Sequence, residues 1–412
     1  MTIRISTALR RTAATGNRVG LRVGALSVLL FALVLPTAEA GATGAPWSDG
    51  SSARNDRGGV VYVMTNATSG NAVLVFVRDR RGRLQALPWA TASTGGLGGS
   101  VTAAIDPLGS QGALVYDEGS NMLFAVNAGD DTVAAFDTGA FGLSLRLKSV
   151  VSSGGFIPVS LAVRDDLLYV LNAGGSGSVT TFRIGLHGGL SQIGALDLGV
   201  SPTATTPPFD QVPAPGQVGI DALARHVIVT HAGGQELLTA TLDDSGIPTA
   251  PLVSTPTPGA GTFAFGVTRF GSTLVAEAAS GSVSAFDPPV DNQPLAVTAS
   301  AVPTGGAATC WIVVHDLGFT YVSNTASNTL SLYTYTRTGD LQLQAPIAAT
   351  TGGAPIDLTL AGRGGFLYSL DAATGEISGF AVDPHSGALM PVETETGLPA
   401  AAGLQGIAAR DF

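Results

Sequence analysis

The feature that most constrains the fold of this chain is a pattern that recurs seven times between residues 63 and 380. Each copy holds an apolar strand that ends in a polar residue, then a short turn and a second strand of the form Val-x-x-Phe. The residues that end the first strand form a column of seven positions: Asn66, Asn127, Asn172, His231, Glu277, Asn324 and Asp371. Successive members are 61, 45, 59, 46, 47 and 47 residues apart, so the basic period is close to 46.

A period near 46 with glycine-rich turns is typical of a β-propeller, in which each repeat is a four-stranded blade. The 55 glycines and 23 prolines suit the many tight turns of such a fold. The two long intervals indicate insertions around Thr94–Ser110 and Ser201–Gly216, and the second has the length and position of a lid or a docking loop. We therefore predict an all-β fold, a seven-bladed β-propeller of four-stranded antiparallel blades over residues 59–412.

A second apolar element precedes each column strand, and it also occurs seven times. We name this element strand A, the column strand B, the Val-x-x-Phe strand C and a trailing strand D. The first copy, from Val60 onward, has no strand A, whereas the last element, Leu404–Ala409, is a strand A with no B after it. Pairing of these two would close the ring and hide the edge strands that otherwise promote aggregation. The seven A elements begin near Gln111, Pro158, Gln217, Phe263, Cys310, Pro355 and Gln405.

The first 40 residues have the pattern of an export signal. Five arginines precede the apolar run Gly24–Leu35, and Ala38-Glu39-Ala40 then supplies a small-x-small cleavage site. The run is too short for a bilayer span, which needs about 20 residues. We predict a signal peptide over residues 1–40, a flexible lead-in over 41–58, and an exported protein, periplasmic or extracellular, with no membrane span in the mature chain.

Cleavage after residue 40 would leave 15 basic and 29 acidic residues, a net charge of −14. A chain this acidic repels nucleic acid, so we expect no nucleic-acid partner. The single cysteine, Cys310, excludes an intrachain disulfide. Phosphate-binding and dinucleotide motifs do not accompany the repeats, so we expect no cofactor. We expect a monomer.

Strands of a blade alternate in direction, so the D–A loops and B–C turns share one rim, here called the D–A rim. The A–B and C–D turns share the other, the A–B rim. By this assignment none of the 15 basic residues lies on the D–A rim, which disfavours phosphorylated or polycarboxylate ligands. A neutral lactone, a neutral sugar, a cation or a protein fits better. The alternative is that the arginines merely occupy turns that tolerate them. Acidic residues expected on the D–A rim are Asp106, Asp130, Asp131, Asp210, Glu236, Glu277, Asp371 and Glu376.

His231 and Glu277 break the Asn/Asp pattern of the column, and we predict them as catalytic residues because either could activate water. Asn172 or Asn324 could then steady the oxyanion. The predicted substrate-binding residues are Asn127, Asn172, Asn324, Asp371, Trp311 and Asp357.

Each of these assignments has a structural alternative. Asn and Asp at strand ends often cap turns, and Trp311 could fill the space between blades. Cys310 could be a nucleophile, but a small buried thiol is the alternative we favour. Asp130 and Asp131 with Asn127 could hold calcium weakly, yet the calcium-loop pattern is missing, so we predict no metal site.

The runs Tyr321–Tyr333 and Leu167–Gly174 resemble those of the seven-bladed lactonase-type propellers with YVTN-type repeats, which include 6-phosphogluconolactonase and carboxymuconate cyclase. The resemblance spans about residues 60–412 and implies a propeller that hydrolyses or forms a lactone. Members that hydrolyse the phosphorylated lactone typically carry Pro-Arg-His where strand A begins. This Arg and His are absent from the start of all seven A elements here, so no family catalytic residue is carried over. The matching positions read Pro158-Val159-Ser160, Cys310-Trp311-Ile312 and Pro355-Ile356-Asp357.

Two functions remain open from the sequence. The first is lactone hydrolysis, or a related cyclisation, of an uncharged lactone on the acidic D–A rim by general-base catalysis. The second is a non-enzymatic scaffold that binds a small neutral ligand or a protein on the same rim. In the enzyme, His231 and Glu277 should face a shared cavity, whereas in the scaffold they should be used in turns.

Overall fold

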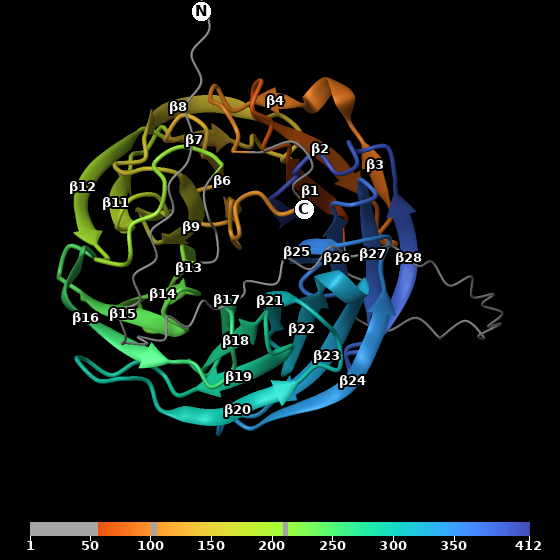
Figure 1. Ribbon diagram of the computed structural model, residues 1–412. Helices are drawn as coiled ribbons and strands as arrows, with labels where there is room; N and C mark the ends of the chain where they lie inside the picture. The colour runs from red at the N-terminus through yellow and green to blue at the C-terminus, as the bar shows by residue number, and fades with distance from the viewer. Residues whose placement is uncertain (1–56, 100–104, 209–212) are drawn as a thin grey trace, which may run out of the picture. The chain divides into compact units, whose positions relative to one another are not determined.

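A computed structural model describes residues 57–99, 105–208 and 213–412. The predicted signal peptide, most of the lead-in and Asp210 lie outside the described residues. The described chain forms seven antiparallel sheets of four strand positions each, which confirms the predicted propeller (Figure 1). Within the described residues no helix is both long and apolar enough to cross a membrane.

Each sheet runs from an inner strand A to an outer strand D, and the inner strands contact one another in ring order. The A strands are β5 (Leu114–Asp117), β9 (Pro158–Arg164), β13 (Pro215–Ile220), β17 (Thr262–Val267), β21 (Thr309–His315), β25 (Pro355–Ala361) and β29 (Ile407–Asp411). The B strands are β1 (Gly59–Met64), β6 (Met122–Asn127), β10 (Leu167–Asn172), β14 (His226–His231), β18 (Thr273–Glu277), β22 (Phe319–Asn324) and β26 (Phe366–Asp371).

The C strands are β2 (Ala72–Arg78), β7 (Thr132–Asp137), β11 (Ser178–Ile184), β15 (Glu236–Leu242), β19 (Ser282–Phe286), β23 (Thr329–Tyr335) and β27 (Glu376–Val382). The D strands are β8 (Arg146–Ser152), β12 (Leu190–Asp197), β16 (Pro248–Pro256), β20 (Val297–Pro303), β24 (Leu341–Thr350) and β28 (Leu389–Glu395). We number the blades from the sheet that contains β1: blade 1 holds β29 and β1–β4, blade 2 holds β5–β8, and each later blade holds the next four strands, up to β25–β28 in blade 7. In blade 1 the outer strand is split into β3 (Leu84–Ala86) and β4 (Ala92–Ser93) by the 3-10 turn η2 (Pro88–Ala90). A second 3-10 turn, η3 (Thr325–Ser327), lies between β22 and β23.

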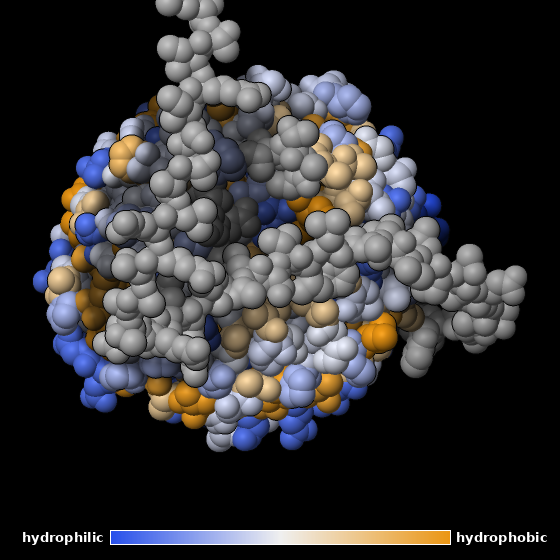
Figure 2. Space-filling view, viewed as in Figure 1, coloured by the Kyte–Doolittle hydropathy of each residue, from blue (hydrophilic) through white to orange (hydrophobic). Residues whose placement is uncertain are grey.

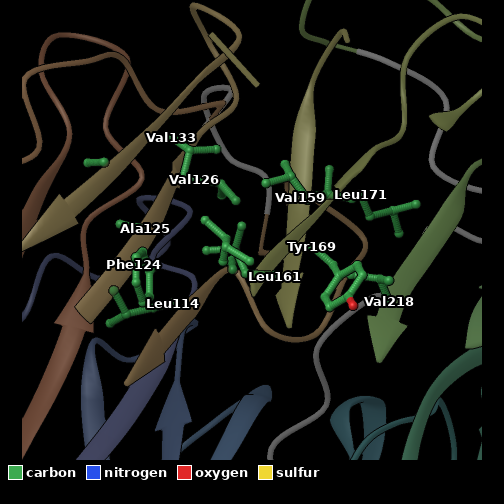
Figure 3. Close-up of a cluster of buried hydrophobic side chains, with 14 of the residues drawn as sticks. Leu114, Phe124, Ala125, Val126, Val133, Val159, Leu161, Tyr169, Leu171 and Val218 are labelled. Carbon is green, nitrogen blue, oxygen red and sulfur yellow. The ribbon is translucent and has the colours of Figure 1, made fainter. Parts of the chain in front are cut away.

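The core lies between the blades and is filled mainly by the B strands, because both faces of a B strand pack against neighbouring sheets. Every residue of β6, β10, β14 and β26 is buried. Figure 3 shows side chains of β6, β9 and β13 gathered in one such cluster. The outer strands alternate between exposed and half-buried residues. On the face drawn in Figure 2, apolar residues accordingly lie in several separate groups around the periphery, interspersed with hydrophilic ones.

Closure of the ring follows the predicted plan. The last strand, β29, pairs antiparallel with β1, with Val61 opposite Ala409. The side chain of Asp411 accepts hydrogen bonds from the backbone N–H groups of Gly362 and Arg363 in blade 7 and pairs with the buried Arg78 at 2.9 Å. The C-terminal strand is therefore bound both to its own blade and to its neighbour.

In four blades, the hydroxyl of a B-strand tyrosine donates a hydrogen bond to the neighbouring blade in the ring. Tyr368 of blade 7 donates to the carbonyl of Gly82 in the C–D turn of blade 1 at 2.6 Å, and three other B-strand tyrosines make the equivalent bond. The accepting glycines have positive φ, and a Cβ at Gly82 would lie 2.3 Å from the Phe366 ring. The other three pairs are Tyr62 with Gly142, Tyr169 with Gly246, and Tyr321 with Gly387.

Loss of one of these hydroxyls should lower stability measurably. We expect Tyr368→Phe to reduce the free energy of unfolding by about 1 kcal/mol, because it removes one buried hydrogen bond with little change in volume. Urea unfolding followed by fluorescence measures the change. Tyr116→Phe is the control, because that half-buried hydroxyl binds only Asn121 within its own blade. An equal loss in both variants would contradict a special role for the bond between blades.

Candidate functional site

The column residues lie at or just beyond the ends of the B strands on the D–A rim, as predicted, but their side chains bind the neighbouring B–C turns, C strands and D–A loops. Asn324 donates from Nδ2 to Thr329 and Ser331 and accepts at Oδ1 from Thr309. Asn127 and Asn172 likewise donate their amides to side chains of the turns or strands that follow them. All three asparagines are buried, which favours the turn-forming alternative over substrate binding.

The two column carboxylates are held in the same way. Glu277 accepts three hydrogen bonds of 2.6–2.7 Å, from the Gly259 N–H and from the hydroxyls of Ser282 and Ser284. Asp371 accepts from Ser369, Ser378 and the Gly352 N–H. Burial raises the pKa of Asp371 to about 6 despite these bonds.

His231 has both ring nitrogens in hydrogen bonds. Nδ1 lies 2.8 Å from Oε1 of Glu236, and Nε2 lies 3.0 Å from the carbonyl oxygen of Pro213. Neither nitrogen therefore has a free lone pair directed at solvent. Three cavities among the described residues, beside Leu74, beside Gln111 and beside Met122, have neither His231 nor Glu277 in their lining. Their catalytic role stays a prediction, and their contacts favour a role in the turns.

The centre of the ring is entered by the end of the first insertion, residues 106–111, which continues into β5 and is the orange segment inside the ring in Figure 1. The carbonyl of Ser110 accepts from Trp311 Nε1 and from Gln405 Nε2, both at 2.9 Å. The Ser110 hydroxyl donates to Val159. Residues of blades 1, 3 and 6 therefore all form hydrogen bonds with this one loop.

Gln111, at the end of this loop, binds a blade on the opposite side of the central channel. Its amide donates to the carbonyl of Ile312 and accepts from the N–H of the same residue, both at 2.9 Å, although Gln111 belongs to blade 2 and Ile312 to blade 6. Beside this bridge lies a cavity of about 330 Å³, lined by Gln111 and by residues of β17, β21 and β25. The bridge and the loop together narrow the central channel.

Trp311, Asp357 and Cys310 lie around the same centre. Trp311 is fully buried and packs edge-on against Phe263 at 4.8 Å between ring centroids, so it fills space between blades. Cys310 is a buried free thiol whose pKa burial raises, so it is held as the neutral thiol. Asp357 is also buried and accepts from the N–H groups of Leu358 and Ile407, which ties β25 to the closing strand.

Asp106 is the titratable residue of this centre that sequence reasoning placed on the D–A rim without assigning it a role. Its Oδ1 accepts from the Gly109 N–H at 2.8 Å, and the Gln405 amide also binds the carboxyl. Although the residue is partly exposed, loss of hydration raises the carboxyl pKa to about 7. Burial, with a smaller contribution from Asp106, also raises the pKa of Asp357 to about 7. The signal in the sequence was an aspartate four residues before the end of an insertion that leads into an inner strand.

These raised pKa values predict that stability falls as the pH rises. Between about pH 4 and 7 the folded chain keeps a proton on Asp357 that the unfolded chain loses. Each unit of difference between the folded and unfolded pKa therefore lowers the free energy of unfolding by about 1.36 kcal/mol above that range. We expect a lower Tm at pH 8 than at pH 5, and a smaller difference in Asp357→Asn. Asp137→Asn is the control, because the pKa of Asp137 is lowered instead. A pH dependence unchanged by Asp357→Asn would contradict the assignment.

The described residues contain no group of three or more His, Cys, Asp or Glu side chains arranged to hold a metal ion. Asp131, for which weak calcium binding was only an alternative in the sequence, accepts from the N–H of Ile157 in the next blade at 2.7 Å.

Comparisons with known proteins identify the family. Residues 99–404 match the model of the lactonase, 7-bladed β-propeller family. Comparison with curated proteins found no match. Among solved structures, the periplasmic gluconolactonase of Pseudomonas aeruginosa is 17% identical with a TM-score of 0.66, and the alignment covers 85% of this chain and 98% of that one. A proposed 6-phosphogluconolactonase of Bacteroides fragilis is also 17% identical, with a TM-score of 0.65 and coverage of 88% and 99%.

At these identities the solved structures establish only the shared fold, but the family model covers most of the propeller from the first insertion to the loop before the closing strand. Together with the closed ring of seven four-stranded blades, this match confirms the resemblance noted in the repeats. The chain belongs to the lactonase family of seven-bladed β-propellers.

Proposed function

We propose that this chain is an exported lactonase that hydrolyses an uncharged lactone on the D–A rim by general-base catalysis. The family supplies the reaction class, and the neighbour named as a periplasmic gluconolactonase is compatible with export and with a neutral substrate. The substrate's lack of charge is our inference from the distribution of cations.

The observation that carries this proposal is the position of the 14 described Lys and Arg residues. All of them lie in A–B or C–D turns, or within three residues of a strand end on that side. A phosphorylated lactone would need guanidinium or ammonium partners, and the D–A rim offers none among the described residues. The 14 cations are Arg57, Arg78, Arg80, Arg81, Arg83, Arg146, Lys148, Arg164, Arg183, Arg225, Arg269, Arg337, Arg363 and Arg410.

The base that best fits the geometry is Asp106, because it is partly exposed at the centre of the rim and its pKa of about 7 suits proton transfer near neutral pH. Its carboxylate would take a proton from water as the oxygen attacks the lactone carbonyl. The ring C–O bond then breaks, and the leaving alkoxide takes up a proton to give the hydroxy acid. His231 and Glu277 remain the bases predicted from sequence, and their use would require their turn contacts to open.

Hydrolysis of a lactone panel tests this proposal. We expect turnover of uncharged γ- and δ-lactones, followed by acid release, and little turnover of 6-phosphogluconolactone under the same conditions. Comparable rates on the phosphorylated lactone would refute the charge argument. No turnover of any lactone would refute the enzymatic proposal.

The second candidate function is a scaffold that binds a neutral ligand or a protein on the D–A rim. It is favoured by one observation: the side chains of His231, Glu277 and Asp371 are buried in hydrogen bonds with their own turns and neighbouring loops. A scaffold would bind lactones or their lactam analogues without releasing acid. Calorimetry and acid release on the same panel therefore separate the two functions.

A further inference from the structure

The two insertions meet on the D–A rim and carry exposed apolar residues there. A Cβ placed on Gly99 of the first insertion would lie 3.8 Å from Pro207 of the second, and 2.9 Å from both Ala128 and Leu108. Ala204 of the second insertion reaches the B–C turn of blade 3, where its carbonyl would lie 3.0 Å from a Cβ on Gly174. The loops therefore form one continuous surface over blades 2 and 3.

The aromatic and aliphatic side chains of this surface are held by backbone contacts to the B–C turns below. The carbonyl of Leu97 accepts from the N–H of Gly129, and the carbonyl of Phe156 accepts from the N–H of Gly174, both at 2.9 Å. These residues are nevertheless exposed to solvent: Leu97 is 40% exposed, Phe156 49% and Ile105 39%. We call Leu97, Ile105, Phe156, Ala204 and Pro207 the apolar strip.

The strip differs from the exposed apolar residues of the opposite rim. Leu186, Leu223 and Leu317 are more exposed, but each stands in a separate turn, and single exposed leucines are ordinary. The strip instead joins loops from three successive D–A connections. Ile105 is also the residue next to Asp106, so the strip begins beside the proposed base.

We propose that the apolar strip binds an alkyl or acyl substituent of the lactone, so that the substrate class is an uncharged lactone with an apolar tail. This inference rests on the proposed function for the position of the ring beside Asp106. The described part of the D–A rim offers no cation that would favour an anionic substituent, and exposed apolar side chains favour a tail by removing its surface from water. The ring would lie toward Asp106 and the tail over Leu97 and Phe156.

A series of lactones with one ring and linear tails of increasing length tests the proposal. Each buried methylene should lower KM by up to about fourfold until the strip is covered. Phe156→Ser should raise KM for the long-tailed lactones by about tenfold and leave the unsubstituted ring unaffected. Leu97→Ser tests the strip a second time, and Leu186→Ser on the A–B rim is the matched control with no effect.

Binding of the corresponding alkyl lactams, measured by calorimetry, separates this proposal from the proposed function. Lactone turnover without dependence on tail length, or equal effects of Phe156→Ser and Leu186→Ser, would contradict tail binding by the apolar strip but not the proposed hydrolysis. Tail-dependent lactam binding without any lactone turnover would support the strip and overturn the enzymatic proposal. Lactam affinity independent of tail length would overturn the strip by a route that does not need turnover.

Discussion

Removal of the last eight residues, Gln405–Phe412, is expected to abolish the soluble monomer. The deletion takes away β29, so β1 becomes an unpaired inner edge next to blades 2 and 7. It also removes Gln405, which holds the loop at the centre of the ring through Leu108 and Ser110. Exposed strand edges pair with other chains, so the truncated protein should aggregate or stay unfolded. Size-exclusion chromatography and circular dichroism measure the outcome, and deletion of Phe412 alone is the control.

Single substitutions test the same closure within a complete chain. Arg78 is buried, pairs with Asp411 and lies over the Phe366 ring at 5.1 Å. Asp411→Ala should therefore lower the free energy of unfolding by about 3–5 kcal/mol, because it removes a carboxylate that pairs with a buried guanidinium. Asp166→Ala removes the partner of the exposed Arg183 and should cost at most about 1 kcal/mol. A soluble, cooperatively folding truncation, or equal losses for Asp411→Ala and Asp166→Ala, would contradict closure by the C-terminal strand.

Asp106→Asn is expected to reduce kcat/KM for the preferred lactone by about 10²–10⁴-fold, which is the usual contribution of a positioned general base. Asparagine keeps the size of the side chain and can still accept from the Gly109 N–H, so the loop should stay in place. Because the carboxyl pKa is about 7, the wild-type kcat/KM should rise with pH below about 7 and level off above it. Rates across pH 5–9, with Tm as a check on folding, measure both effects.

His231→Ala and Glu277→Ala are the informative comparisons for this prediction. If their side chains act in the turns, they should lower Tm and leave kcat/KM per folded molecule nearly unchanged. A large loss of kcat/KM in either variant, with Asp106→Asn fully active, would show that the substituted column residue, and not Asp106, is the catalytic base.

Much of the fold could be predicted because the signals were local and repeated. The seven column residues lie at B-strand ends, or, for Asn66, two residues beyond, since each repeat carries the same alternation of apolar strand and turn. Even the pairing of the first and last elements followed from the repeat, because the chain starts with strand B and ends with strand A. Boundaries were less accurate: β5 begins at Leu114, three residues later than predicted, because the preceding loop enters the channel instead of extending the strand.

The candidate site was harder to predict because side-chain direction and long-range contacts decide it. His231 and Glu277 stood out by residue type, yet hydrogen bonds to Pro213, Glu236, Gly259 and nearby serines now account for their polar atoms. Nothing in the local sequence around Asp106 indicated that Gln405, almost 300 positions away, would lie against it.

The sequence by itself determined the number of blades, the order of their strands, the closure and the side of the ring on which the described cations lie, because each depends on periodicity and strand direction. Only the tertiary structure decided that the first insertion enters the channel, that Asp106 and Asp357 lose enough hydration to titrate near 7, and that the two insertions meet over blades 2 and 3. Those properties arise from contacts between residues far apart in the chain, and such contacts leave no period in the sequence.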